Sequence, residues 1–302
     1  MDLQQETRQI RQIRSLRELS PHYEVIFCDI WGVVHNGVAA FPSACAALSG
    51  FRRRGGTVVL ITNAPRPSAP VIRQLLKLGV SADAFDAVAT SGEVAVELIK
   101  ERIDEPVLHI GPARDLSLFE AAGAAAGRAP RRVAVGDARY AVCTGLRDDV
   151  HETAADYEDE LRHMAGRGLT MICANPDIVI HRGDELIYCA GAIARKYEET
   201  GGLVVYAGKP HAPIYERATA LAEQARGSPV RRERILAIGD GMSTDIAGAV
   251  GAGLDALLVT RGIHRDALHG ESLQTFVDAD KLHRLCEAWR LWPIAAIGAL
   301  QE

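Results

Sequence analysis

The 302-residue chain is 48% hydrophobic and 24% charged, an ordinary globular composition that supports a folded core and excludes an intrinsically disordered protein. Its length exceeds the usual size of one domain, so we expect two domains or one large α/β unit. The net charge of -5 is not clustered, and it indicates neither a nucleic-acid polymer nor an anionic membrane as a partner.

The cysteines and the apolar runs bear on the cell compartment. The six cysteines are scattered, with no CxxC pair and no zinc-like spacing, which predicts buried reduced thiols in a cytoplasmic protein. No apolar run approaches the length of a membrane span, and the N-terminus lacks the apolar core of a signal peptide. For residues 4–20 we expect a solvated amphipathic helix that leads into the first strand.

From residue 25 onward, short apolar runs alternate with helical patterns. The runs that we predict as strands are 25–29, 57–63, 86–91, 106–111, 132–137, 140–145, 169–175, 203–208, 235–240 and 256–260. The helical stretches are 69–79, 92–103, 156–168, 190–202 and 214–227. This order is typical of an α/β fold in which crossover helices join parallel strands.

The first of these strands ends at a carboxylate. Its sequence "VIFCD" ends at Asp29 and fits a strand buried on both faces, and the following Trp31 and Gly32 break the apolar run. An acid at the C-terminal end of such a strand lies where open α/β sheets bind their ligands. An aspartate that caps a turn through its own backbone would give the same pattern.

Three later strand ends carry further polar residues that phosphoryl chemistry uses. Thr62 and Asn63 follow the second strand, Lys209 follows "VVYAG", and "ILAIGDGMSTDI" carries Asp240 and Asp245. With the carboxylate of the first strand, they supply a nucleophile, donors for phosphate oxygens, a cation, and acids that can hold a metal. Singly, each has a structural explanation as a turn residue, a surface lysine or a helix cap. All of them in this order, each after an apolar strand, favour phosphoryl transfer.

Four segments resemble the ordered motifs of the haloacid dehalogenase superfamily of phosphatases: "FCDIWGVV", "LITN", "GKP" and "GDGMSTDI". The segment "ANPD" at 174–177, followed by "AGAIA", is similar to class IIA, the branch with a large α/β cap between the second and third motifs. That branch includes NagD-like nucleotide phosphatases, p-nitrophenyl phosphatases and pyridoxal phosphate phosphatase. The resemblance spans residues 25–262.

The resemblance implies a doubly wound parallel-sheet core with an inserted α/β cap. The spacing between the second motif and the lysine leaves room for such a domain. We therefore expect the core to comprise residues 1–103 and 204–302, and the cap, which sets substrate specificity, to comprise residues 104–203. By analogy with relatives, we also expect a homodimer that forms through the cap.

The resemblance also implies a magnesium site. It makes Asp29 the nucleophile and a Mg²⁺ ligand, with the backbone carbonyl of Trp31 and the side chain of Asp240 as further ligands. Asp245 is expected to orient the lysine or a metal-bound water.

The remaining residues of the motifs are expected to hold the phosphate. Thr62 and the amide of Asn63 would bind phosphate oxygens, and Lys209 would neutralise charge on the nucleophile and the phosphate.

The sequence departs from the family at Trp31, where a second aspartate normally follows the nucleophile by two residues. That aspartate protonates the leaving alcohol and then activates water, general acid–base work worth about a hundred- to ten-thousand-fold. An indole does not titrate. Because the metal uses only the backbone of this residue, the metal site is expected to survive. His35 is either a replacement acid or a polar loop residue without a proton role.

Two hypotheses follow. In the first, the protein is a working phosphatase with an altered or replaced acid. In the second, it is a degenerate hydrolase that binds a phosphorylated metabolite as a sensor or partner. Retention of the nucleophile favours the first, because a pure binder has no need of one.

The substrate class is limited to small phosphorylated metabolites, such as a sugar phosphate, a nucleotide, pyridoxal phosphate or a small carbon phosphate. In the cap, His181 and Arg182 are candidates to contact an anionic or hydroxylated substrate tail. The surrounding "HRGDE" reads equally well as a charged turn in a solvated hairpin.

Overall fold

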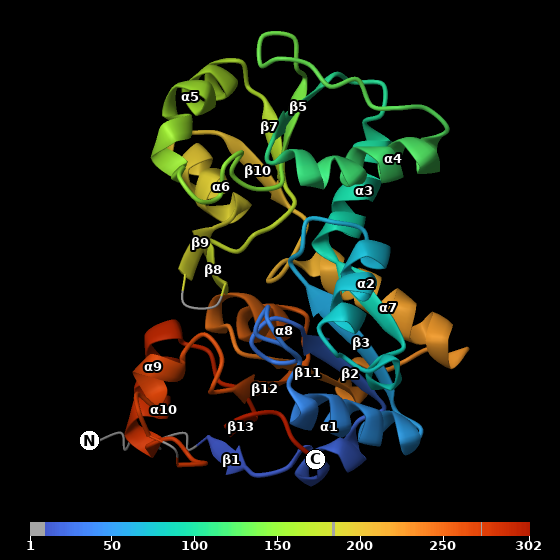
Figure 1. The fold of residues 1–302 in the computed structure, drawn as a ribbon, viewed down its shortest axis with the longest axis vertical. Coiled ribbons are helices and arrows are strands. Elements are labelled where there is room, and N and C mark those ends of the chain that lie inside the picture. The colour runs from blue at the N-terminus through green and yellow to red at the C-terminus, as the bar shows by residue number, and fades with distance from the viewer. Residues whose placement is uncertain (1–9, 183–184, 273) are drawn as a thin grey trace, which may run out of the picture.

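The computed structural model describes residues 10–182, 185–272 and 274–302, apart from the side chains of residues 181, 182, 185 and 186. Figure 1 shows two bodies stacked along the long axis of the molecule, each built around its own sheet. Within the described part of the chain, none of the helices has the length and apolar character needed to span a bilayer.

The larger body is built on a seven-stranded sheet in which all neighbouring strands are parallel. Its order is β1-β13-β12-β11-β2-β3-β4. The strands are β1 (Arg11–Ile13), β2 (Val25–Asp29), β3 (Thr57–Thr62), β4 (Ala87–Thr90), β11 (Ile235–Gly239), β12 (Asp255–Val259) and β13 (Ala295–Ile297). The chain runs outward in opposite directions from β2 and β11, so a topological switch point lies between these two strands.

Helices cover both faces of this sheet. In β2, Val25 and Phe27 belong to one apolar cluster, whereas Ile26 and Cys28 belong to another, so successive side chains are buried on opposite faces. The helices are α1 (Pro42–Arg53), α2 (Ser68–Lys77), α3 (Ser91–Glu101), α7 (Ala212–Arg226), α8 (Ala247–Gly251), α9 (Arg265–Leu268) and α10 (Ala279–Trp289). Short 3₁₀ turns lie at Leu16–Glu18, Ser20–His22, Ala82–Ala84 and Arg232–Arg234, and a π-helical turn at Met242–Ile246.

The smaller body is a four-stranded parallel sheet of order β10-β7-β6-β5 with its own apolar core. Its strands are β5 (Val107–Ile110), β6 (Tyr140–Cys143), β7 (Thr170–Cys173) and β10 (Leu203–Tyr206), and its helices are α4 (Ser117–Ala126), α5 (Glu158–Gly166) and α6 (Ala190–Glu199). Short 3₁₀ turns lie at Ala113–Leu116 and Ala154–Tyr157. An antiparallel hairpin of β8 (Val179–Arg182) and β9 (Glu185–Tyr188) lies on the side that faces the larger body (Figure 1).

These sheets confirm the predicted α/β fold class with a parallel-sheet core. They also support the division into a core and an inserted cap, which stays a prediction. Strand β10 pairs with β7 in the smaller sheet and runs to Tyr206, slightly beyond the cap boundary expected at residue 203.

The amphipathic helix expected for residues 4–20 is wrong for the residues that the structure describes. Residues 11–13 form β1, an edge strand that pairs in parallel with β13, and residues 1–9 lie outside the described residues. The spacing of Ile10, Ile13 and Leu16 fits a helix, but β-branched isoleucines also suit a strand. The segment forms a strand because it pairs with β13, near the other end of the chain.

The strand predicted at 132–137 is also wrong. A single bridge joins this segment to Val107, whose carbonyl accepts the Val133 N–H at 2.9 Å, and the chain then turns at Asp137. Val133 and Val135 pack against the core of the smaller body from a loop. The alternation of apolar and other residues in this segment therefore reflects side-chain packing of a loop and does not mark a strand. The pattern also missed β1, β8, β9 and β13, which are short.

Two buried tyrosines of the smaller body differ in how their hydroxyl groups are satisfied. Tyr197 donates a hydrogen bond to the carbonyl of Leu169 at 2.5 Å. The hydroxyl of Tyr140, equally buried, has no hydrogen-bond partner among the described residues. Burial of an unpaired hydroxyl costs free energy, whereas a satisfied one contributes.

We therefore predict that Tyr197→Phe lowers the free energy of unfolding by about 1 kcal/mol, because a satisfied hydrogen bond is lost. Tyr140→Phe, its matched control, removes only an unpaired group and should leave the stability unchanged or raise it. Urea unfolding followed by circular dichroism measures both. Equal losses in the two variants would contradict this assignment of hydroxyl partners.

Candidate active site

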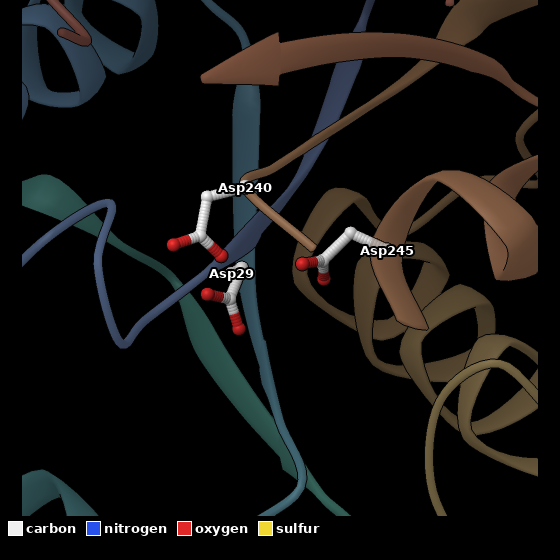
Figure 2. A group of neighbouring side chains, drawn as sticks. All are labelled: Asp29, Asp240 and Asp245. Atoms are coloured by element: carbon white, nitrogen blue, oxygen red, sulfur yellow. The ribbon is translucent and has the colours of Figure 1, made fainter. Parts of the chain in front are cut away.

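Three aspartates converge at the C-terminal edge of the larger sheet. Asp29 is the last residue of β2, and Asp240 directly follows the neighbouring strand β11. Asp245 comes from the π-helical turn after β11. One carboxylate oxygen from each lies within 4.8 Å of the others, and all three residues are buried (Figure 2). The parallel strands thus place all three acids at the switch point of the sheet.

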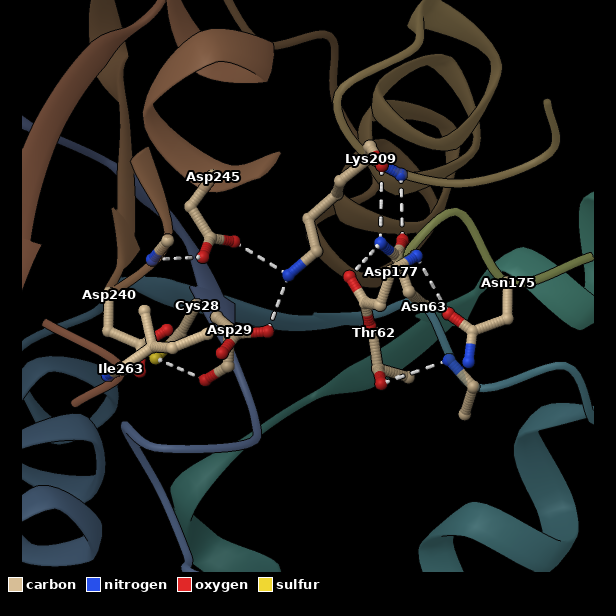
Figure 3. A network of polar contacts seen from close by, with 12 residues as sticks. Cys28, Asp29, Thr62, Asn63, Asn175, Asp177, Lys209, Asp240, Asp245 and Ile263 are labelled. Atoms are coloured by element: carbon tan, nitrogen blue, oxygen red, sulfur yellow. Dashed lines mark hydrogen bonds and ion pairs between the residues drawn. The ribbon is translucent and has the colours of Figure 1, made fainter. Parts of the chain in front are cut away.

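Lys209 links two of these acids. Its Nζ donates to Asp29 Oδ1 at 2.5 Å and to Asp245 Oδ1 at 2.6 Å (Figure 3). Lys209 is only 4% exposed, Asp29 8% and Asp245 6%. Burial alone would lower the pKa of Lys209, but the carboxylates of Asp245 and Asp29 outweigh it and raise the pKa well above the ordinary value. The lysine is therefore a fixed positive charge beside the nucleophile candidate.

One lysine does not balance three buried carboxylates. Burial, followed by repulsion from Asp245, raises the pKa of Asp29 well above its ordinary value despite the lysine. The same two causes raise the pKa of Asp240 to about 7. A cluster of hard oxygen donors with surplus negative charge fits a divalent cation such as Mg²⁺.

The side chain of Asp240 is held by its surroundings. Its Oδ2 accepts a hydrogen bond from the N–H of Ile263 at 2.7 Å. Gly32 and Gly262 border the same oxygen, since a Cβ atom at either position would lie 2.2 Å or 1.9 Å from it. Gly32 also has a φ of +83°, which favours glycine. The peptide that joins Trp31 to Gly32 therefore lies beside Asp240.

Asp245 is fixed in a similar way. Its Oδ2 accepts the N–H of Gly241 at 3.0 Å, which leaves Oδ1 for the lysine. A Cβ atom at Gly239 would lie 2.2 Å from the Asp245 side chain, so the glycine of the "GD" pair makes room for it. These contacts place Asp245 against Lys209, as expected for a residue that orients the lysine.

Little empty space remains between the lysine and the apolar core. A cavity of about 10 Å³, room for one water at most, lies between the charged groups and apolar walls that include Phe27, Ile61 and Ala237. The space in this cavity is too small for a phosphate group.

Thr62 and Asn63 lie where β3 ends beside β2. The Oγ1 of Thr62 accepts the N–H of Ala64 at 3.2 Å and is partly exposed. The Asn63 side chain is buried and binds the backbone of Lys209 and the carboxylate of Asp177. The sequence predicts a role only for the backbone amide of Asn63. Its side-chain contacts, and Asp177 itself, were missed because their partners are far away in the sequence.

Trp31 and His35 pack together in the loop after β2. Their rings meet edge to face with centroids 5.0 Å apart, and the indole lies over Gly37, where a Cβ atom would come within 2.7 Å of it. His35 is buried, and its Nδ1 accepts the N–H of Gly37 at 2.9 Å. Burial lowers the pKa of His35 to about 4. A neutral imidazole whose Nδ1 holds the loop favours the structural role of His35 over a replacement acid.

His181 and Arg182, predicted to lie in the cap, are on β8, in the hairpin that faces the larger body. Their side chains are outside the described residues, so their contact with a substrate remains a prediction.

Comparisons with known proteins agree with this geometry. The family model of haloacid dehalogenase-like hydrolases matches residues 26–125, and a HAD-hydrolase-like model matches residues 206–285. A solved hydrolase of the haloacid dehalogenase-like family from Brucella suis 1330 is 43% identical, with a TM-score of 0.82 over 95% of this chain and 99% of that one.

Two curated enzymes are also similar over most of their length. The ribonucleotide monophosphatase NagD of Escherichia coli K12 is 27% identical over 79% of this chain and 88% of its own. The 5'-nucleotidase YutF of Bacillus subtilis is 26% identical over 80% of this chain and 88% of its own. The two family models cover the segments that carry the motifs of the site, and the Brucella protein matches nearly the whole chain. The chain therefore belongs to the haloacid dehalogenase-like hydrolases, and within them to the class IIA phosphatases.

Proposed function

We propose that this phosphoric monoester hydrolase is a divalent-metal-dependent phosphatase that forms an aspartyl-phosphate on Asp29. The observation that carries the proposal is the buried contact of Asp29 with Lys209, with Asp240 and Asp245 close enough to share one ion. A carboxylate nucleophile divides a difficult displacement at phosphorus into two easier ones.

The reaction consists of two displacements at phosphorus. In the first, a carboxylate oxygen of Asp29 attacks the phosphorus atom while the bond to the leaving oxygen breaks. In the second, water attacks the phosphorus atom, the bond to Asp29 breaks, and inorganic phosphate leaves with the carboxylate restored. Lys209 neutralises charge on Asp29 and on the phosphate in both steps. Thr62, at the end of β3 beside β2, would donate to a phosphate oxygen.

The metal would be held by the carboxylates of Asp29 and Asp240 and by the carbonyl of Trp31. When bound, Mg²⁺ neutralises charge on the phosphate oxygens and helps to position them. The buried surplus of carboxylates over lysine supports this assignment.

Trp31 distinguishes this chain within the proposed mechanism. Neither Trp31 nor the neutral His35 carries a proton that is readily transferred near pH 7. The leaving oxygen must then depart unprotonated or take its proton from water. Phenolates leave readily in this way, whereas alkoxides do not.

The substrate class is a small phosphorylated metabolite, supported by relatives named as a 5'-nucleotidase, a ribonucleotide monophosphatase and a dihydroxyacetone phosphatase. The loss of the acid at residue 31 favours one alternative, a catalytically degenerate protein that binds such a metabolite as a sensor or partner. The cytoplasmic location and the homodimer through the cap stay predictions.

The first test concerns the nucleophile. Asp29→Asn should reduce Mg²⁺-dependent hydrolysis of p-nitrophenyl phosphate by at least about a thousandfold, because an amide does not form the aspartyl-phosphate. The fold should persist, since the variant removes a charge whose burial is unfavourable. Circular dichroism checks the fold, and Asp280→Asn on the exposed surface of α10 is the matched control. Substantial activity in Asp29→Asn would falsify the assignment.

The second test concerns the leaving group. Trp31→Asp should raise kcat for alkyl phosphates by up to about a hundredfold while changing aryl phosphate turnover little, because only alkoxides need the proton. Steady-state kinetics on glycerol phosphate and p-nitrophenyl phosphate measure the ratio. A proportional change on both substrates would contradict the argument. Wild-type protein that binds Mg²⁺ but hydrolyses neither substrate would favour the degenerate binder.

The third test uses the raised pKa of Asp240. In the metal-free fold this carboxyl group keeps its proton up to about pH 7, whereas the unfolded chain releases it near pH 4, so the metal-free fold loses stability between these values as the pH rises. Mg²⁺ requires the deprotonated group. It should therefore raise the Tm more at about pH 8 than at about pH 6.

Scanning fluorimetry with and without MgCl₂ measures this difference. Asp240→Asn is the control, because it lacks the titrating ligand and should show a small Mg²⁺ effect at both pH values. An equal rise in the Tm of the wild-type protein at both pH values would rule out the assigned ligand.

A further inference from the structure

The Asn63 side chain holds both backbone groups of the catalytic lysine. Its Oδ1 accepts the N–H of Lys209 at 2.7 Å, and its Nδ2 donates to the Lys209 carbonyl at 3.2 Å. The two residues are 146 positions apart in the chain and are both buried. A Cβ atom at Gly208 would lie 2.3 Å from Asn63 Oδ1, so the amide passes directly against this peptide. The position of the lysine backbone thus depends on the orientation of one amide group.

A carboxylate from the smaller body binds the same amide group. The Nδ2 of Asn63 also donates to Asp177 Oδ1 at 2.8 Å (Figure 3). An ionised carboxylate only accepts hydrogen bonds, so the amide must turn its nitrogen toward Asp177 and its oxygen toward the Lys209 N–H. In a flipped amide, the Asn63 oxygen would face the Asp177 carboxylate and the Lys209 carbonyl, both of which are acceptors. Its NH₂ group would face the Lys209 N–H, which is a donor. Asp177 therefore reinforces the orientation that the Lys209 N–H and carbonyl already require, and it holds the Asn63 side chain in place.

Asp177 belongs to the segment that leaves β7 for the β8–β9 hairpin, and this segment is held on two sides. The Asp177 carbonyl accepts the N–H of Gly191 at the start of α6 at 3.1 Å. On the core side, Ser91 Oγ of α3 donates to the carbonyl of Ala174 at 2.5 Å. The position of the smaller body is thereby linked through Asp177 and Asn63 to the lysine.

We propose that Asp177 is a positioning residue for the hydrolysis. Through Asn63 it holds the Lys209 backbone so that the ammonium group lies between Asp29 and Asp245. The inference rests on the proposed function, in which the lysine neutralises charge at Asp29. It adds a residue from the cap side to the groups that order the site.

The kinetic test compares five variants, one of them a double variant, with p-nitrophenyl phosphate and glycerol phosphate as substrates. Asp177→Ala should lower kcat by about ten- to a hundredfold with little change in KM, because the lysine is misplaced more than the substrate contacts are. Asp177→Asn keeps an oxygen that accepts from Asn63 and should restore most of the activity. In the background of Asn63→Ala, Asp177→Ala should cause no further loss. Ser91→Ala removes another core–linker contact of the same segment and should leave kcat nearly unchanged.

Three results would overturn the proposal. Equal losses of kcat in Asp177→Ala and Ser91→Ala would mean that Asp177 only anchors the linker. A full additional loss from Asp177→Ala in the Asn63→Ala background would mean that it does not act through Asn63. A loss in Asp177→Asn that is confined to alkyl phosphates would make Asp177 a proton donor.

A second measurement needs no turnover, so it separates this proposal from the proposed function. Reductive methylation of Lys209, followed by mass spectrometry of the intact fold, reports how tightly the amine is held. The rate should rise severalfold in Asp177→Ala and Asn63→Ala, and remain at the wild-type value in Ser91→Ala. Unchanged rates in both of the first two variants would refute the positioning role even if the wild-type protein hydrolyses nothing. Conversely, raised rates in an inactive protein would leave the positioning role standing and the proposed activity refuted.

Discussion

The contact of one buried ammonium group with two buried carboxylates is the interaction on which the site depends. Removing charged groups from water costs several kcal/mol each, and only close pairing with further hydrogen bonds offsets this cost. Lys209 pairs with Asp29 and Asp245, while backbone N–H groups satisfy the outer oxygens of Asp245 and Asp240. The apolar clusters on both faces of the sheet hold these groups in place. The arrangement still carries more negative than positive charge, which suits a site that receives a cation together with a phosphate.

Much of this site could be predicted from the sequence, for a physical reason. Parallel neighbours in a sheet end at the same edge, so polar residues that follow separate apolar runs converge even when the strand order is unknown. That argument correctly brings together Asp29, Thr62 and Asp240. It does not reach Lys209, which is 180 positions from Asp29 and follows a strand of the smaller sheet. The sequence pattern did include Lys209, because it follows an apolar strand, but the shared edge of one sheet does not explain why that residue reaches Asp29.

Other features could not be predicted because their determinants are tertiary. Asn63 and Asp177 are 114 positions apart, and nothing local to either residue indicates their hydrogen bond. The short strands β1 and β13 form by pairing with one another and with the larger sheet. Each is too short to show the alternation of apolar and polar residues that marks a strand in the sequence. The role of His35 depended on burial in a loop, where its ring meets Trp31 and its nitrogen accepts from the backbone. A histidine near an active-site motif looks the same in sequence whether it transfers protons or supports a turn.

The position of Lys209 directly after the last strand of the smaller sheet has a consequence for how such enzymes diversify. The chain returns from the cap along β10 and reaches the lysine before it enters α7. If Lys209 and Asp177 act as proposed, an exchange of the smaller body between relatives would have to join within a few residues of the lysine and bring a compatible acid at position 177. Point substitutions in the cap away from this junction avoid that constraint. On the proposed division of the chain, new specificity should thus arise more readily by substitutions within an inherited cap than by the exchange of whole caps.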